Sequence, residues 1–399
     1  MVSTDTHEPL KFSFIDAIRG YAILMVIVCH SVLSYDGMVW PIKRLASLGW
    51  HGVQLFFVAS SLTLLLSWSS RKRHESKPAL LFFIRRWFRI APMYFVAFAI
   101  YFLLNPPGVK FSWTQVFSTL TFVNAWSPMQ TPTVASAWSS VPGSWSVSDE
   151  FGFYLLFPLL ATYIRGLRSS LIFLASCLAL SLILNSIFLP NFELYYTQSA
   201  ASQFIYYWLP NQLPVFAIGF VVFALIGKLL SNQNTVKIRA ILSSYTTVII
   251  AASWVLFFSL AYTDASRYLL VSNLHVPIHI MASTIFAAII VVMSLGGKTV
   301  FNNAPIQLVG RLSFSAYLVH FGVIHVIYDL FPGLLGVHTT GVSGVLHCVV
   351  FLLLVFMVTF SISWASYTFI EKPFIGLGKR VCVWVDERGW LGLQRRADA

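Results

Sequence analysis

The stretch FSFIDAIRGYAILMVIVCHSV at residues 12–32 is long and apolar enough to cross a membrane as a helix, yet it carries ionisable side chains. Helical geometry places Arg19 and His30 on one face about 16 Å apart, with Asp16 on nearly the same stripe. Such groups are costly inside a membrane unless they face protein or water. The stripe therefore points into a helix bundle. It is either a functional site, or an interfacial Asp16–Arg19 ion pair with a hydrogen-bonded core histidine.

Composition places the whole chain in the membrane class. Of its 399 residues, 57% are hydrophobic and only 10% are charged, and the mean hydropathy is +0.76. Soluble domains carry about 25% charged residues. The net charge of +12 does not indicate nucleic-acid binding, because the basic residues lie in short loops and ends beside the apolar segments.

Apolar segments recur along the chain and predict an all-α, polytopic integral membrane bundle of about ten transmembrane helices. They cover residues 12–34, 50–68, 80–104, 150–164, 170–189, 210–230, 241–262, 275–296, 308–330 and 344–369. The predicted outside loops carry only Lys43, Arg44, Lys110 and Arg267, so both termini are expected in the cytoplasm. We expect residues 1–375 to form the transmembrane domain and residues 376–399 a basic cytoplasmic tail on the inner membrane surface.

Cysteine and histidine spacing gives no sign of a disulfide framework or a metal site. The four cysteines, Cys29, Cys177, Cys348 and Cys382, lie in or beside apolar segments without a framework spacing. His275 and His279 are spaced i, i+4, but no further ligands accompany them. We therefore expect neither a disulfide nor a bound metal.

The densest basic region runs from RKRHESKP at residues 71–78 into IRRWFR at residues 84–89. Most of these charges fit an inside-positive topology signal with snorkelling side chains. Arg86 and Arg89 differ because their i, i+3 spacing puts them on one helix face. Guanidinium groups can bind phosphate oxygens bidentately, a chemistry that an arginine pair on one face would support.

Two acidic residues lie in the stretch GSWSVSDEFGFYLLFP at residues 143–158, which follows the long outside loop. Ser146 can cap the next helix with Asp149 as its reciprocal partner. Glu150 also suits a helix N-terminus electrostatically, so capping alone can explain both acids. His30 is expected in the outer half of its helix, and Glu150 at a similar depth. A His30–Glu150 pair is therefore predicted if the two helices are neighbours.

Later stretches add polar groups to the predicted bundle. The sequence GRLSFSAYLVHF at residues 310–321 places His320 inside a span, as a bundle hydrogen-bonder or as a substrate contact. Aromatic residues gather near the outside loop at 190–210, either as a membrane-interface belt or as rings that stack on a sugar. They are Tyr195, Tyr196, Tyr206, Tyr207 and Trp208.

Several of these stretches together resemble the acyltransferase-3 family of membrane acyltransferases, in order along residues 12 to about 375. The matching positions are Phe14, Asp16, Arg19, Gly20, Ala22 and His30; Gly52, Phe56, Phe57 and Ser60; the arginine pair in IRRWFRIAP; Gly143, Trp145, Ser146, Glu150, Phe153, Tyr154 and Pro158; Gly310, Ser313, Ser315, Tyr317, Leu318 and His320; and Tyr367, Ile370, Glu371, Lys372 and Pro373. The chain departs from the usual pattern at Ile15, Gln54, Ser61 and Val147.

The resemblance implies an O-acyltransferase that moves an acyl group, most often acetyl, from cytosolic acyl-CoA to a sugar hydroxyl. It implies lipid-linked or polymeric acceptors such as lipopolysaccharide, capsule or exopolysaccharide, and a place in a bacterial inner membrane. Arg86 and Arg89 would hold the donor. The expected catalytic residues are His30, Glu150, Arg19 and Asp16. Trp145, Ser313, Tyr317 and His320 are expected to contact substrate or to support the fold.

Two other classes of protein compete with this interpretation. In a secondary transporter, Asp16, Arg19 and His30 would form a proton or substrate relay. Transporters commonly have repeated halves, and no internal repeat is evident in this chain. A purely structural membrane protein would leave the intramembrane charges unexplained.

Overall fold

A computed structural model describes residues 13–35, 38–104, 112–131, 140–260, 262, 277–296, 299–331 and 340–397. Helices and short turns make up these residues, and no strand occurs among them. The first half contains α1 Ser13–Leu33, α2 Trp40–Ser47, η1 Leu48–His51, α3 Gly52–Arg71, α4 Pro78–Leu103, α5 Trp113–Leu120, α6 Trp145–Tyr163, α7 Leu167–Tyr195 and α8 Gln198–Tyr207. The second half contains α9 Leu209–Ser231, η2 Gln233–Thr235, α10 Val236–Ser244, α11 Thr246–Ser259, α13 Ile278–Ser294, α14 Ala304–Arg311, α15 Ser313–Leu330, α16 Gly341–Ser366, η3 Tyr367–Glu371 and α17 Lys372–Ala397.

The prediction of an all-α polytopic membrane protein is confirmed. Within the described residues, six helices are long and apolar enough to span a membrane. A seventh span is formed if α10 and α11, which are bent by 68° at their junction, act together. Each of the ten predicted segments contains a helix, but ten spans and cytoplasmic termini remain predictions.

Helix α1 lies at the centre of the bundle, in contact with α3, α14, α15 and α16. Small residues allow its close packing on α14. A Cβ added to Gly310 would lie 1.7 Å from the carbonyl oxygen of Asp16, and one added to Gly20 would lie 2.3 Å from that of Ile306. Arg19 and His30 of the polar stripe face cavities within the bundle, whereas the Asp16 side chain stays 33% exposed.

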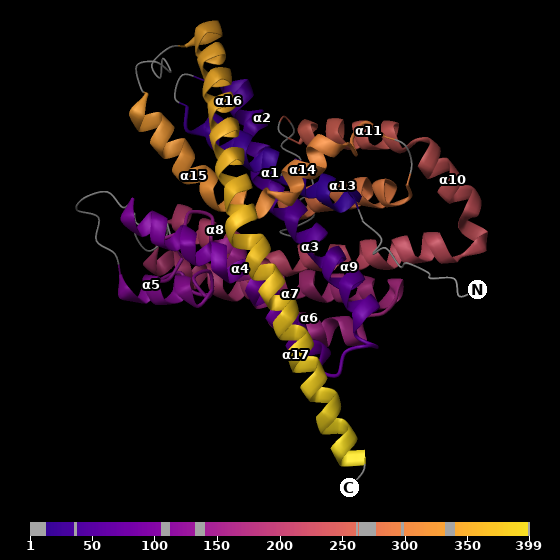
Figure 1. Cartoon of the computed structure of the whole chain (residues 1–399). Coiled ribbons are helices and arrows are strands. Elements are labelled where there is room, and N and C mark those ends of the chain that lie inside the picture. The colour runs from indigo at the N-terminus through magenta and orange to yellow at the C-terminus, as the bar shows by residue number, and fades with distance from the viewer. Residues whose placement is uncertain are drawn as a thin grey trace.

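The last span continues without a break into the C-terminal segment. A single π-helical turn, Tyr367–Glu371, joins α16 to α17, and the combined helix crosses the whole molecule (Figure 1). Helix α17 packs along α4. The predicted tail, residues 376–399, begins within α17, and its separation from the transmembrane domain stays a prediction.

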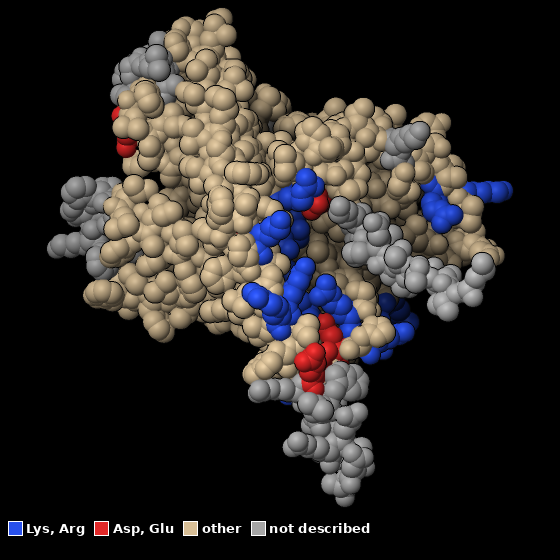
Figure 2. Space-filling model, in the orientation of Figure 1, with Lys and Arg blue, Asp and Glu red and all other residues tan. Residues whose placement is uncertain are grey.

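Basic side chains are unevenly distributed over the surface. Figure 2 shows most of the visible Lys and Arg atoms gathered in the central and lower part of one face, while the upper and left parts carry none. Such a one-sided distribution is typical of a membrane protein whose basic residues remain on one side of the bilayer.

Candidate active site

Three helices bring charged side chains, and a fourth brings a hydroxyl, to one narrow cavity of about 80 Å³, which we call the arginine cavity. Arg19 comes from α1, Arg86 and Arg89 from α4, Glu150 from α6, and Ser313 from α15. Three guanidinium groups and one carboxylate line it, so positive charge predominates. The cavity is therefore suited to an anionic ligand.

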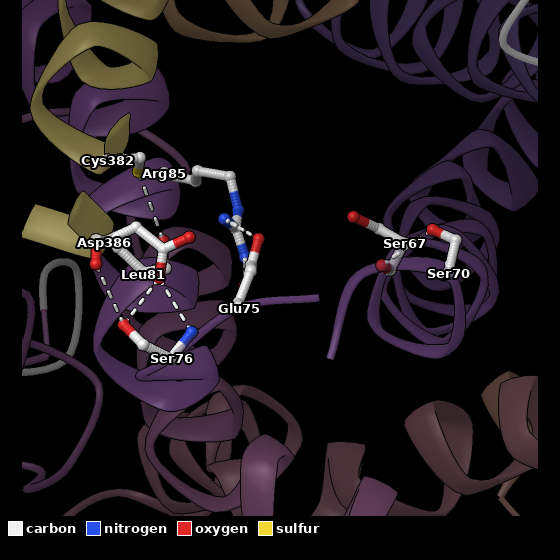
Figure 3. Close-up of polar contacts among 8 residues, drawn as sticks. All are labelled: Ser67, Ser70, Glu75, Ser76, Leu81, Arg85, Cys382 and Asp386. Carbon is white, nitrogen blue, oxygen red and sulfur yellow. Dashed lines mark hydrogen bonds and ion pairs between the residues drawn. The ribbon is translucent and has the colours of Figure 1, made fainter. Parts of the chain in front are cut away.

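Only two of the three arginines in the segment 84–89 face this cavity. Arg85 turns away to the preceding loop, where its two terminal nitrogens donate to the two carboxylate oxygens of Glu75 at 2.6 and 3.1 Å (Figure 3). The same loop is tied to α17, because Ser76 donates to the carboxylate of Asp386. Arg85 is thus neutralised by a protein carboxylate, whereas Arg86 and Arg89 line the cavity.

The arginines retain hydrogen-bonding capacity for a ligand. The Nε atom of Arg86 is buried without a protein partner, and its guanidinium lies over the Phe82 ring, 5.8 Å from the centroid. Arg19 donates to the Thr63 hydroxyl at 3.4 Å. The Arg86 Nε atom therefore has a hydrogen left to donate to an acceptor in the cavity.

The acidic residues near the cavity have protein partners. Glu150 accepts a hydrogen bond from the Tyr154 hydroxyl at 3.1 Å and interacts electrostatically with Arg19. Asp16 lies 4.0 Å from the guanidinium of Arg311. It also interacts electrostatically with Arg19, so it belongs to the same charge network without lining the cavity.

His30 lines a second, larger cavity of about 240 Å³, which we call the histidine cavity. Its ring lies 4.3 Å from Phe321 and 5.4 Å from His320, centroid to centroid. The Nδ1 atom of His320 bonds the carbonyl oxygens of Tyr317 and Ala316, at 2.7 and 3.2 Å. Because carbonyls only accept, this nitrogen carries the hydrogen. The other ring nitrogen, Nε2, is buried without a partner.

Aromatic rings form much of the wall of the histidine cavity. Trp145 at the start of α6 stacks on Tyr207 at 4.6 Å, and its centroid is 5.6 Å from that of Tyr206. Trp50 and Gln203 complete this side. Such a surface provides flat apolar faces next to hydrogen-bonding edges.

The sequence profile of the acyltransferase-3 family, described as an acyltransferase domain, matches residues 12–368. The chain belongs to the acyltransferase-3 family. It is also similar to the acyltransferase MdmB of Streptomyces mycarofaciens, with 24% identity over 339 residues that cover 82% of each chain. No solved structure matches this chain.

Two sequence-based expectations for this acyltransferase-3 chain are not met. Glu150 lines the arginine cavity and His30 the histidine cavity, so the predicted His30–Glu150 pair is absent from the described structure. The bundle packs His320 of α15 beside His30, whereas Glu150 on α6 faces the arginines. The expected capping box is also wrong. Ser146 lies within α6 and donates to Gly143 and Tyr317, and neither carboxylate oxygen of the buried Asp149 has a hydrogen-bond partner.

The buried acid Glu371 was identified from the sequence only as a position of the family resemblance, with no role predicted for it. Glu371 lies in the π-helical turn, is 4% exposed, accepts a hydrogen bond from the Ser315 hydroxyl and interacts electrostatically with Arg89. Single-turn π-helices occur frequently at functional sites. The signal in the sequence was an acid between Ile370 and Lys372 at the end of an apolar span.

Among the described residues, no group of three or more His, Cys, Asp and Glu side chains is placed to hold a metal ion. His279 instead bonds the carbonyl oxygen of Asn211 at 3.0 Å. His275, its predicted companion, lies outside the described residues.

Proposed function

We propose that this membrane acyltransferase transfers an acyl group, most simply acetyl, from cytosolic acyl-CoA to a hydroxyl of a cell-surface or lipid-linked carbohydrate. Lipopolysaccharide, capsule and exopolysaccharide are the acceptor classes. One observation carries the proposal: the arginine cavity and the histidine cavity adjoin, sharing Val53 and Tyr317 in their walls. A phosphate-bearing donor in the first cavity can therefore reach a histidine base in the second.

The donor assignment rests on charge. Coenzyme A is rich in phosphate, and Arg86, Arg89 and Arg19 all present guanidinium groups to the cavity. Hydrogen bonds between ionised groups are about twice as strong as neutral ones. A volume of about 80 Å³ is too small for a whole nucleotide, so the cavity would hold only part of the donor.

His30 supplies the base in this scheme. Its imidazole takes the proton of the acceptor hydroxyl as the oxygen attacks the thioester carbon. The carbon–sulfur bond then breaks, and the imidazolium returns the proton to the leaving thiolate. The products are an ester and free coenzyme A, and His30 is regenerated. A two-step route through an acylated histidine has the same overall balance.

The acceptor assignment rests on the aromatic wall. Sugars present apolar faces that pack on rings such as Trp145 and Tyr207, and hydroxyls that need hydrogen-bonding partners such as Gln203. Membrane lipid surrounds the spans, and a bacterial inner membrane fits a cytosolic donor with an outward acceptor. The family membership favours this function over the transporter alternative.

The direct test is acyl transfer by purified protein in lipid nanodiscs. Radiolabelled acetyl-CoA should give labelled glycan and free coenzyme A when isolated surface glycan is added. Cells with and without the protein should differ in ester-linked acetyl on their surface glycans. Protein that releases no coenzyme A with any acyl-CoA, and cells with unchanged glycans, would contradict the proposal.

A further inference from the structure

The reacting carbonyl must lie where the two cavities meet, if the donor is bound by the arginines and activated opposite His30. Two residues line both cavities, Val53 and Tyr317. Valine offers only methyl groups at this junction. The Tyr317 hydroxyl is therefore the one side-chain hydrogen-bond donor shared by the two linings.

The Tyr317 hydroxyl belongs to a triangle of hydrogen bonds that links α15 to the start of α6. It donates to the carbonyl oxygen of Gly143 at 2.9 Å. Ser146 donates either to the Tyr317 hydroxyl, at 2.8 Å, or to the same Gly143 carbonyl, at 3.0 Å. The Ser146 backbone N–H also donates to this carbonyl, at 3.3 Å, so the Gly143 oxygen stays paired when either hydroxyl turns away.

We propose that Tyr317 is the oxyanion donor of the acyl transfer. This inference rests on the proposed function. When the acceptor oxygen attacks, the carbonyl π electrons move to its oxygen, which becomes negative. The Tyr317 hydroxyl donates a hydrogen bond to that oxygen and keeps its proton. As the carbon–sulfur bond breaks, the electrons return to re-form the carbonyl, and the interaction weakens.

The triangle lets Tyr317 turn to the substrate without leaving a polar group unpaired. When the Tyr317 hydrogen points to the oxyanion, Ser146 donates to Gly143 and satisfies its carbonyl oxygen. Gly143 has a φ of +77°, which side chains rarely adopt, and a Cβ there would lie 2.9 Å from the Tyr317 hydroxyl. The glycine therefore holds its carbonyl close to the tyrosine.

The test compares two tyrosines whose hydroxyls each link α15 to another part of the bundle. Tyr317→Phe should lower the single-turnover rate of acyl transfer by about 10²–10³-fold, the usual effect of losing one oxyanion donor. The KM for acyl-CoA should change little, because the oxyanion forms only during reaction. Tyr101→Phe is the matched control. Its hydroxyl also bonds α15, at Leu318 and Gly322, but lines neither cavity.

Replacing Tyr317 by 3-fluorotyrosine keeps the ring and the hydrogen bonds while making the hydroxyl a stronger donor, so it remains informative if the Phe variant does not fold. We expect the single-turnover rate to rise. Equal losses in Tyr317→Phe and Tyr101→Phe, or an unchanged rate with 3-fluorotyrosine, would overturn the assignment. If His30→Ala is inactive while Tyr317→Phe retains full activity, this inference fails and the proposed function stands. Absence of acyl transfer by the wild-type protein would contradict both the proposed function and this inference.

Discussion

The imidazoles of His30 on α1 and His320 on α15 lie 5.4 Å apart, centroid to centroid, and the Nε2 atom of His320 has no protein partner. His320 donates through Nδ1 to backbone carbonyls, so its Nε2 atom carries a lone pair that can accept a hydrogen bond. We predict that His30 donates to this nitrogen during the reaction and directs the lone pair of its other ring nitrogen into the cavity. His320 would then position the base that we had expected Glu150 to position.

We predict that His30→Ala abolishes acyl transfer and that His320→Ala lowers kcat by a smaller factor. General-base catalysis typically contributes about 10²–10⁴-fold, so the loss in His30→Ala should be at least of this size. In the double variant, loss of His320 should add little, because there is no base left to position. His325→Ala on the same helix, an exposed residue paired with Asp329, is the control. Additive effects of the two histidines would show that they act independently.

The arginines of α4 should separate into two classes. Arg86→Ala and Arg89→Ala should each weaken binding of acyl-CoA, because each removes a charge-assisted contact worth about 1.5–3 kcal/mol, or ten-fold or more in affinity. Arg85→Ala removes the same charge from the same helix but breaks only the pair with Glu75. Its donor affinity should remain near that of the wild type. Equal losses at all three positions would mean that net charge, and not the cavity, binds the donor.

The sequence could predict which helix faces are polar, because ionisable residues in an apolar segment must face protein or water. Arg19 was identified on that ground, whereas Arg86 and Arg89 were identified by their i, i+3 spacing and by the family resemblance. All three line one cavity. His30 and Trp145 likewise meet in the histidine cavity. Hydropathy and spacing are local properties, so they identified the spans and the faces but not which helices touch.

Contacts between helices depend on side-chain shape over long sequence separations, and here the sequence-based argument failed. Equal depth in the membrane was taken to allow a His30–Glu150 pair, but α15 supplies the neighbouring ring instead. The role of Ser146 was missed for the same reason. A serine near a helix start suggests a cap, and only the packing of α15 against α6 shows its bond to Tyr317.

Topology can be tested with single cysteines, because all four native cysteines are buried and can be replaced. His74→Cys, on the exposed loop before α4, should react with an impermeant maleimide only from the cytoplasmic side. Met129→Cys, 72% exposed on the segment after α5, should react only from the opposite side. Labelling of both from one side would contradict the ten-span topology and the cytosolic donor.

The packing of α14 on α1 gives the sharpest stability prediction. In Gly310→Ala, the new Cβ would lie 1.7 Å from the carbonyl oxygen of Asp16, which is backbone and cannot rotate away. The helices must separate, at a cost of about 1–3 kcal/mol or more, and this moves the turn of α1 that carries Arg19. We therefore expect a lower melting temperature in detergent and loss of acyl transfer.

Gly227→Ala in α9 is the control, since no atom lies within 4 Å of its added Cβ. Replacing glycine by alanine inside a helix is worth about 0.5–1 kcal/mol, so that variant should be at least as stable as the wild type. Equal melting temperatures for both variants would show that the close contact between α1 and α14 does not hold the site together.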